Sequence, residues 1–249
     1  MYSGVAEVSP SRLYRDQGVV LRTIKLGEAD RIVTLVTPGH GKVRAVAKGV
    51  RKTKSRFGSR LEPISHVSLL MYEGRDLDIV TQAETLDHFR TIREDLDRMG
   101  RAQSLLEAVD QVAQEREPSA RLYSMLVGAL RSLAARDAPL LLAAFFWKLL
   151  SAEGAHPLLD QCASCGAPED LVAFDLVEGG ALCRSCRRGV PITPEALALL
   201  RRVLGGGLAA ALDEPAGPIV LEVEQLATGS LEHHLERRLR TLHVLDRSG

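Results

Sequence analysis

Four cysteines in two closely spaced pairs constrain this chain more than any other feature. Cys162, Cys165, Cys183 and Cys186 are all the cysteines that the sequence contains, and 17 residues separate the second from the third. Two C-x2-C pairs at this separation are typical of a zinc ribbon, because each tight turn can deliver two thiolates to one tetrahedral ion. We therefore predict one structural Zn²⁺ held by all four thiolates.

The neighbouring sequence agrees with a ribbon. Gly166 and Gly189 follow the second and fourth cysteines, where a knuckle turn requires a positive φ that glycine adopts readily. Between the pairs, residues 171–175 and 179–182 have the composition of two short strands.

Other uses of the four cysteines fit the sequence less well. Disulfides are typical of secreted chains, and the first residues here are polar and lack a secretory signal. A redox C-x-x-C usually stands alone beside a βαβ pattern, which is missing. A catalytic zinc needs an open coordination position, and four thiolates leave none. We expect the metal to stabilise structure and the compartment to be a reducing cytoplasm.

The net charge of zero hides a strong asymmetry along the chain. Residues 1–60 contain 13 Lys and Arg against four Asp and Glu, so they carry +9 and the remaining residues carry −9. Such asymmetry is typical of a module that binds a polyanion, attached to an acidic body.

The N-terminal part alternates like a set of short strands. The expected strands are 17–24, 30–37, 42–50, 64–72 and 77–84, with turns at 38–41 and 73–76. In the third, Val43, Ala45 and Ala47 fall on one face and the intervening residues on the other. Five short antiparallel strands in so few residues favour a small closed barrel such as an OB-fold. Residues 1–13 have no periodic pattern, and we expect a loose tail there.

From Asp87 onward the apolar period becomes helical. Residues 99–112 and 122–133 repeat at three-and-four spacing, and 140–150 is apolar nearly all round, which is typical of a buried central helix. Thr193 and Pro194 start a helix that ends at 205–207, and a last helix begins near Pro218 with an apolar stripe at Leu231, Leu235, Leu239 and Leu242. The predicted architecture is multidomain α+β: an OB-fold over 1–85, then a helical domain over 86–249 with the zinc ribbon at 160–190 inserted between helices.

One segment concentrates the positive charge. Between residues 42 and 60 there is no acidic residue. Lys and Arg at such density neutralise phosphates in a sequence-independent way, and single-strand binders add aromatic faces on which bases stack. A solvated loop that binds nothing is the alternative, which an OB-like barrel makes less attractive. The predicted DNA-binding residues are Lys42, Arg44, Lys48, Arg51, Lys52, Lys54, Arg56, Phe57 and Arg60, with Tyr72 on the next strand as a further aromatic.

Signals of catalysis are weak. The sequence has no G-x-x-x-x-G-K-[ST] phosphate loop and no G-x-S-x-G elbow. Asp76 and Asp78 imitate a metal pair, although an acid in a turn is the commoner meaning. The stretch Phe145-Phe146-Trp147, which holds the only tryptophan of the sequence, is predicted to belong to the core, and the alternative is that part of it lines a groove for a partner's peptide. No apolar run reaches the length of about 18 residues that spans a bilayer. We expect a protein that is not an enzyme and not in a membrane.

Several of these segments together resemble the bacterial RecO family of recombination mediators. The resemblance runs from about Tyr14 to the end of the chain. It rests on residues 27–33, Gly41-Lys42, 48–52, 54–58, Leu61-Glu62-Pro63, and Phe146, Leu149, Leu150, Gly154, Pro157 and Leu159 leading into the cysteines.

The resemblance implies both a fold and a function. It implies an N-terminal OB-fold, a helical domain and an embedded zinc ribbon. It further implies binding to single- and double-stranded DNA and annealing of complementary strands. The implied partners are RecR, the C-terminal tail of single-strand DNA-binding protein and, indirectly, the RecA filament that these proteins help to load. The basic surface of the family corresponds here to Lys42, Arg44, Lys48, Arg51, Lys52 and Arg56.

Two other functions stay open from the sequence. The chain could be a protein-interaction adaptor whose acidic helical body, around Trp147, recruits partners while DNA contact is incidental. A zinc-dependent nuclease is less compatible with the sequence, because four thiolates saturate the metal and no carboxylate cluster accompanies them.

Overall fold

The structure, a computed structural model, describes residues 12–241. By their contacts the residues form two compact units, which we describe separately. The first comprises the described part of Met1–His88 together with Ala113–Tyr123, and the second comprises Phe89–Val112 and the described part of Ser124–Gly249. The division into domains at residues 85 and 86 stays a prediction.

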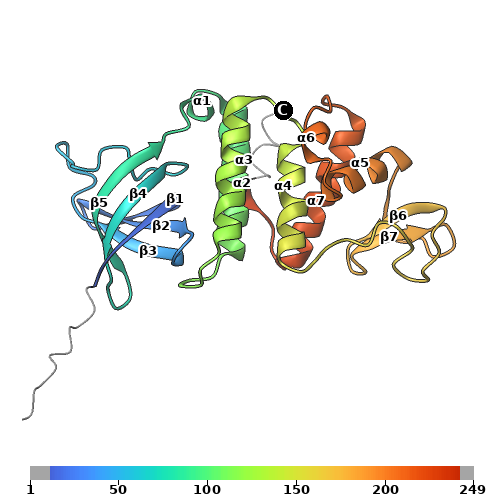
Figure 1. Cartoon of the computed structure of the whole chain (residues 1–249), viewed down its shortest axis with the longest axis horizontal. Helices are drawn as coiled ribbons and strands as arrows, with labels where there is room; N and C mark the ends of the chain where they lie inside the picture. Colours follow the sequence, from blue (N-terminus) through green and yellow to red (C-terminus); the bar gives the residue numbers. More distant parts are fainter. Residues whose placement is uncertain (1–11, 242–249) are drawn as a thin grey trace, which may run out of the picture. The chain divides into compact units, whose positions relative to one another are not determined.

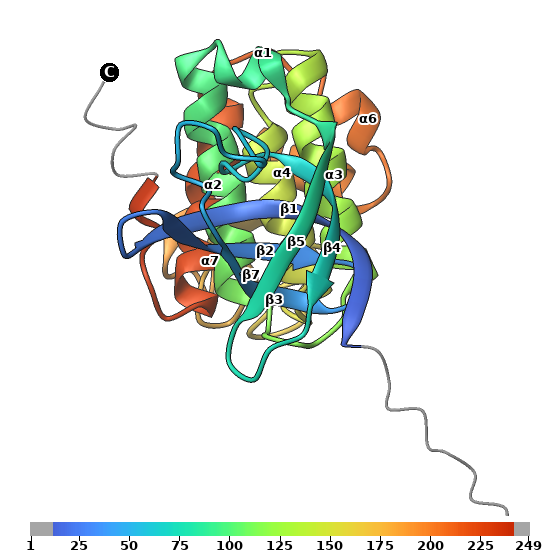
Figure 2. The same cartoon turned by 90° about the vertical axis from the view of Figure 1, so that its left-hand side faces the viewer.

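The first unit is a closed five-stranded barrel (Figures 1 and 2). Its strands follow one another around the barrel in the order β1-β2-β3-β5-β4, with β3 and β5 parallel and the other neighbours antiparallel. This confirms the predicted OB-like barrel, while the prediction that all five strands are antiparallel is wrong for the pair β3 and β5. The strands are β1 (Leu13–Leu26), β2 (Asp30–Thr37), β3 (Gly41–Ala47), β4 (His66–Tyr72) and β5 (Asp78–Asp87).

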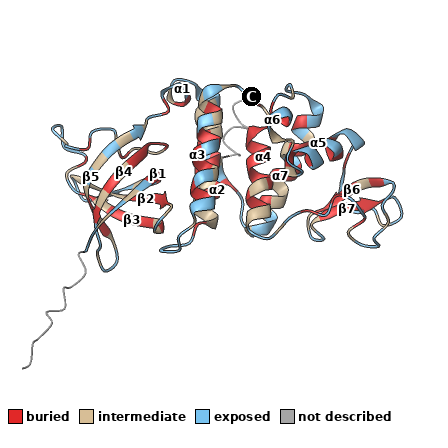
Figure 3. Ribbon diagram, viewed as in Figure 1, coloured by how far each residue is buried: buried red, intermediate tan, exposed pale blue. Residues whose placement is uncertain are grey.

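Alternation along the strands fills the barrel. Val43, Ala45 and Ala47 on β3 are fully buried, as predicted, while the residues between them are half-buried. Figure 3 shows buried residues on the other strands too, although β2 is buried continuously from Val33 to Thr37 and does not alternate. Successive side chains of a strand point to opposite faces, so a single register places one set inside.

The first strand is longer than predicted. β1 begins at Leu13 and serves two neighbours: residues 13–19 pair with β4, and residues 19–26 pair with β2, with a bulge between Val20 and Arg22. Its N-terminal half is polar, so the sequence gives no alternating signal there. Of the predicted tail, residues 1–11 lie outside the described part of the chain.

A segment from the helical part of the sequence belongs to the barrel unit. The N–H of Lys42 donates to the carbonyl of Gln114 at 3.0 Å, and the N–H of Arg116 donates to the carbonyl of Lys42 at 3.1 Å. Gly41, with a φ of +64°, allows this approach, because a Cβ there would lie 2.0 Å from the carbonyl oxygen of Glu117. Residues 113–117 therefore run beside the start of β3.

The second unit contains the helices and the small ribbon sheet. Its helices are α1 (Arg90–Arg93), α2 (Leu96–Val112), α3 (Ala120–Ala135, whose first residues belong to the barrel unit), α4 (Leu141–Ala152), α5 (Pro194–Leu204), α6 (Leu208–Ala211) and α7 (Pro218–His234). Nine residues of α4 are buried, which confirms the predicted central helix (Figure 3). A three-stranded sheet lies between α4 and α5 in the chain: β6 (Leu171–Asp175), β7 (Gly180–Cys183) and β8 (Val190–Pro191), in the order β7-β6-β8.

The predicted helix ends are partly right. Thr193 caps α5, accepting a hydrogen bond from the N–H of Ala196 at 3.2 Å, and Pro194 is the first helical residue. The predicted stripe of the last helix is wrong beyond Leu231, because α7 ends at His234 and Glu236 adopts a left-handed φ of +51°. Leu235 and Leu239 therefore lie outside the helix, and Leu242 lies outside the described residues.

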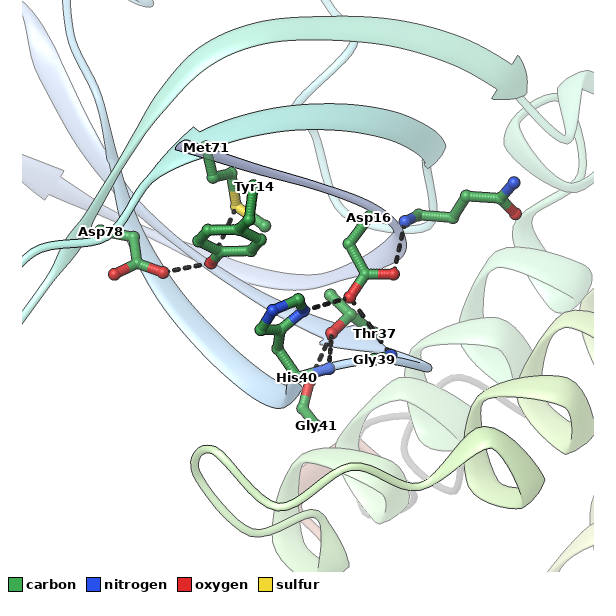
Figure 4. Close-up of polar contacts among 9 residues, drawn as sticks. Tyr14, Asp16, Thr37, Gly39, His40, Gly41, Met71 and Asp78 are labelled. Carbon is green, nitrogen blue, oxygen red and sulfur yellow. Dashed lines mark hydrogen bonds and ion pairs between the residues drawn. The ribbon is translucent and has the colours of Figure 1, made fainter. Parts of the chain in front are cut away.

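The barrel closes at a buried carboxylate. β3 meets β5 through only two paired positions, and one of them is Asp78, which is fully buried. Its carboxylate accepts hydrogen bonds from the Tyr14 hydroxyl, from the N–H of Gly74 at 3.0 Å and from the Arg116 guanidinium at 2.5 Å; Figure 4 shows the Tyr14 contact. Burial opposes ionisation of Asp78, but these hydrogen bonds outweigh it and hold its pKa below the usual range. The ionised Asp78 side chain therefore has a structural role. Its hydrogen bonds exclude the alternative in which Asp76 and Asp78 together bind a metal ion.

A second polar cluster holds the turn between β2 and β3 (Figure 4). The Asp16 carboxylate on β1 bonds to Nδ1 of His40 at 2.6 Å and accepts the N–H of Gly39 at 3.2 Å. The Tyr14 ring packs against the His40 ring with centroids 4.2 Å apart. Both clusters tie β1 to turns that the barrel brings close.

We expect Asp78→Asn to lower the free energy of unfolding by about 2 kcal/mol at neutral pH, because hydrogen bonds to charged groups typically contribute about 1.5–3 kcal/mol. Chemical denaturation at pH 7 measures this. Asp76→Asn is the matched control: Asp76 is exposed in the preceding turn, so its change should stay within about 0.5 kcal/mol.

The same variant predicts a pH dependence. A carboxyl whose pKa is lowered by folding stabilises fully above the pKa of the unfolded chain, about 3.9, and loses this contribution as pH falls through the lower folded value. The stability difference between wild type and Asp78→Asn should therefore shrink in acid, below about pH 4. A difference that stays constant down to acid unfolding would contradict an ionised Asp78.

Candidate nucleic-acid interface and metal centre

The predicted DNA-binding residues lie on β3 and on the loop from Lys48 to Ser65 that follows it. Lys42 and Arg44 are on β3, and the other seven are in the loop. The exposed members are Lys48, Arg51, Lys52, Lys54 and Arg56, whereas Lys42, Arg44 and Arg60 are half-buried and Phe57 is buried.

Three apolar side chains anchor this basic loop. Val50, Phe57 and Leu61 belong to the same buried cluster as the barrel interior. Burying each such side chain contributes about 1.5–3 kcal/mol, so the loop is held to the barrel although its surface is cationic. The sequence analysis did not predict this anchoring. The signal for it was the presence of three apolar residues within a run of cationic ones.

The base-stacking role predicted for Phe57 is wrong. Its side chain is 1% exposed, and the Arg56 guanidinium lies 4.9 Å from the ring centroid. Removing the apolar ring from water at the end of the barrel lowers the free energy more than leaving it exposed in the loop, so the ring is buried in the barrel core. Phe57 positions the loop, and Tyr72, which is 37% exposed, is the accessible aromatic of the two.

Short-range hydrogen bonds shape the loop and engage two of its arginines. The Arg60 guanidinium donates to the carbonyls of Arg56 at 2.8 Å and Phe57 at 3.2 Å. Arg51 donates its N–H to the carbonyl of Ala29 at 3.0 Å and its guanidinium to that of Gly27 at 3.1 Å. Neutral carbonyl partners leave the positive charge of both side chains uncompensated.

The cations on β3 have an acidic neighbour. The Arg44 guanidinium lies 3.7 Å from the Glu115 carboxylate, which the segment 113–117 places beside β3. Because a carboxylate offsets part of the attraction for phosphate, the exposed cations of the loop are the stronger part of the positive surface.

The four cysteines converge, as the ribbon prediction required. Their sulfur atoms all lie within 4.8 Å of one another, and the Cys165 and Cys183 sulfurs are 3.7 Å apart. Four thiolates about 2.3 Å from one ion occupy tetrahedral corners about 3.8 Å apart, whereas a disulfide needs about 2.05 Å. The cluster therefore has the donor set and spacing of a closed four-coordinate metal site.

Hydrogen bonding within the cluster shifts the pKa values of two of the thiols in opposite directions. The backbone N–H of Cys183 is the main cause that lowers the pKa of Cys162 to about 6. Hydrogen bonding to the Cys165 and Cys183 sulfurs raises the pKa of Cys186 to about 12. Four thiolates in one cluster repel each other, and a bound cation compensates them.

The ribbon sheet presents the two cysteine turns. Gly166 and Gly189 have φ values of +77° and +73°, which confirms the predicted knuckle glycines. Behind the sheet, Phe174 on β6 packs edge-on against Trp147 on α4, with centroids 5.6 Å apart. Trp147 is 1% exposed and is a core residue, whereas Phe145 of the same Phe145-Phe146-Trp147 stretch lines a groove, so the alternative of a partner-binding groove stays a prediction for that part of the stretch.

The helical unit does carry a groove nearby. Its volume is about 280 Å³, and its lining comes from α3, α4 and α6. Gly128, Phe145, Leu208 and Leu212 give it an apolar floor, and Lys148 adds one cation. Such a site suits an apolar group beside a negative charge.

Among the residues that the structure describes, no helix combines the length and apolar character that crossing a membrane requires.

Comparison with known proteins agrees with both halves of the fold. Residues 11–89 match the family model "Recombination protein O N terminal", and residues 93–243 match "Recombination protein O C terminal". A curated relative, "DNA repair protein RecO" of Nocardioides sp. (strain ATCC BAA-499 / JS614), is 46% identical over 244 residues, covering 94% of this chain and all of the relative. With a barrel, a helical unit and four clustered cysteines in place, the chain belongs to the RecO family.

Proposed function

We propose that this protein is a non-enzymatic DNA-binding mediator of recombination in DNA repair. It binds single- and double-stranded DNA, anneals complementary strands and helps RecA load onto strands coated with single-strand DNA-binding protein. The observation that carries the proposal is the basic loop, in which five exposed cations cover an apolar anchor and no acid interrupts residues 42–60.

The physical role of the loop is to hold phosphates. Each Lys or Arg that neutralises a phosphate releases condensed counterions, which favours binding and makes it dependent on salt. Two strands held on one positive surface repel each other less, so complementary sequences meet more often. This chemistry needs no group that donates or accepts a proton in a reaction.

We infer that the ion in the cysteine cluster is Zn²⁺ with a purely structural role. Four thiolates select a soft tetrahedral ion and leave no position for water. The small ribbon sheet contains too few residues to form a sufficient core alone, and metal binding supplies the missing stability.

The groove on α3, α4 and α6 supports a contact with single-strand DNA-binding protein. A chain terminus offers a carboxylate beside its last side chain, which complements Lys148 and the apolar floor. We propose that the C-terminal tail of that protein docks here, that RecR is a second partner, and that the protein acts in the cytoplasm at the nucleoid. The groove also favours the alternative function, an interaction adaptor for which DNA contact is incidental.

One prediction of the proposed function concerns the basic loop. Changing Lys48, Arg51, Lys52 and Arg56 together to Ala should weaken binding to a labelled single strand at least about tenfold near 0.1 M salt. It should also reduce the slope of log K against log salt by about 2 to 3 units, because each lost phosphate contact removes about 0.7. Fluorescence anisotropy across a salt series measures both, with circular dichroism to establish folding.

A variant of equal charge change controls this experiment. Arg121, Arg131, Arg184 and Arg187, all exposed in the sequence beyond the barrel strands, are changed together to Ala. If this control reduces the slope of log K against log salt as much as the loop variant does, the net charge of the protein explains DNA binding and the position of the loop does not. If the loop variant binds like wild type, the adaptor function becomes the better account.

The second prediction concerns the metal. Cys162→Ser should lower bound zinc well below one equivalent and lower the melting temperature, because it replaces a buried thiolate ligand. The salt slope of DNA binding should persist in the fraction that remains folded. Elemental analysis and thermal denaturation measure these effects. Ser164→Ala, between two ligands and exposed, is the control, and a fully folded wild type without metal would refute the structural role.

The third prediction concerns the groove. Gly128→Leu should fill part of the groove, since a Cβ at Gly128 meets nothing within 4 Å, and Lys148→Glu should reverse its charge. Each variant should weaken binding of a peptide with the tail sequence of single-strand DNA-binding protein about tenfold or more, as for a central contact residue. Isothermal titration measures this. Unchanged peptide affinity in both folded variants would place the tail elsewhere.

A further inference from the structure

The four cysteines of the cluster differ in their access to solvent. Cys162 and Cys183 are buried, Cys186 is half-buried and Cys165 is exposed. Tetrahedral coordination by four thiolates needs no contact with water, so holding the ion does not require the exposure of Cys165. An oxidant that arrives from solvent meets Cys165 before the other three, because the oxidation of a cysteine depends on its accessibility.

A second thiol from the other cysteine turn lies beside Cys165. The sulfur atoms of Cys165 and Cys183 are 3.7 Å apart. Since the sulfurs of a disulfide are about 2.05 Å apart, an approach of about 1.7 Å is enough to join them. The bond would connect the two cysteine turns, which lie on either side of β6 and β7 in the chain.

The backbone holds these two turns together without help from a metal. The N–H of Ala163 donates to the carbonyl of Ala181 at 2.8 Å, which ties the first cysteine turn to β7. Cys183 is the last residue of β7. Cys165 and Cys183 therefore stay neighbours while an oxidation proceeds, so a second thiol is at hand before Cys165 is oxidised further.

We propose that the cysteine cluster is a redox-sensitive switch, in which a peroxide joins Cys165 to Cys183 as a disulfide and the metal is released. The inference rests on the structural Zn²⁺ of the proposed function and adds a regulation of that site. The ribbon then has two states, one held by four ligands around an ion and one held by a single disulfide.

The reaction balances with hydrogen peroxide as the oxidant. The Cys165 sulfur attacks one peroxide oxygen, so an S–O bond forms and the O–O bond breaks. The Cys183 sulfur then attacks the Cys165 sulfur, so the S–S bond forms and the S–O bond breaks. Each step expels a hydroxide, which takes a proton from solution and becomes water, and the two sulfurs together supply two electrons. Cys162 and Cys186 remain as thiols, and two ligands are too few for a closed tetrahedral site.

Loss of the metal reaches the core of the helical unit through β6. Cys183 is paired with Leu171 at the start of β6, and Phe174 of the same strand packs against Trp147 of α4. Four metal ligands contribute more folding free energy to a small domain than one disulfide does. The oxidised ribbon is therefore less firmly folded, and the packing of Phe174 on Trp147 is the element that the switch biases.

The test uses the whole chain loaded with one equivalent of Zn²⁺ and then treated with hydrogen peroxide. A metallochromic dye follows the released zinc, and the emission of Trp147, the only tryptophan of the sequence, reports on the ribbon contact. Wild type should release its zinc while the emission moves to longer wavelength, and dithiothreitol with Zn²⁺ should reverse both changes. Peptide mass spectrometry of the oxidised protein should find the disulfide between Cys165 and Cys183.

Two variants separate the exposed ligand from the others. Cys165→His replaces the exposed sulfur with a nitrogen ligand, and sites with three cysteines and one histidine also hold zinc. This variant should bind one zinc and release it in peroxide at least about tenfold more slowly than wild type, because the remaining thiolates are less accessible. Cys186→His is the matched comparison: it has the same donor set but keeps Cys165 and Cys183, so its zinc should leave at a rate close to that of wild type.

Several results would overturn the inference. A wild type that keeps its zinc in peroxide would do so, as would a disulfide between other cysteines or equal zinc release from the two variants. Zinc release with unchanged Trp147 emission would contradict the coupling to α4. If a variant does not fold, the disulfide mapped in wild type decides. Failure of the structural metal role has a different signature, because wild type would then be fully folded without zinc before any oxidant is added.

Discussion

The buried charge of Asp78 is the interaction on which the barrel surface depends. β3 and β5 share only two paired positions, so this seam would be the weakest in the barrel without side-chain support. The Asp78 carboxylate joins β1 through Tyr14, the turn before β5 through Gly74, and the segment 113–117 through Arg116. A buried carboxylate is stable only when hydrogen bonds replace its water. Meeting that requirement draws four separate stretches of chain together and supports the short pairing of β3 with β5.

The basic loop shows how a barrel can present charge without losing order. Five cations that repel one another would keep a free loop extended and mobile. Here Val50, Phe57 and Leu61 insert into the barrel core, and the burial of apolar area opposes the repulsion. The cations are then held on one side of the loop, next to β3 and the turn between β1 and β2. The positively charged surface is therefore arranged before any ligand arrives, which reduces the entropy cost of ordering it on binding.

The ribbon follows a different principle. Its three strands are short, and its link to the helices runs through Trp147 and Phe174. A cluster of four thiolates is unfavourable on its own and becomes favourable around a cation, which makes the folded ribbon and the bound metal one equilibrium. The loop of the barrel thus carries its charge at the surface, whereas the ribbon gathers its four thiol groups into one cluster.

The sequence by itself determined the features that depend on local pattern. The cysteine spacing, the alternation on β3, the Thr193 cap and the apolar α4 could all be predicted, because each follows from a repeat or a turn within a few residues. The RecO resemblance also came from the sequence. Only the tertiary structure decided the rest. It buried Phe57, placed Glu115 beside Arg44 and surrounded Asp78 with hydrogen-bond donors where β3 meets β5. These features depend on which distant segments of the chain meet. Strand register and burial are determined by the packing of the whole barrel, and a short stretch of sequence does not contain that information.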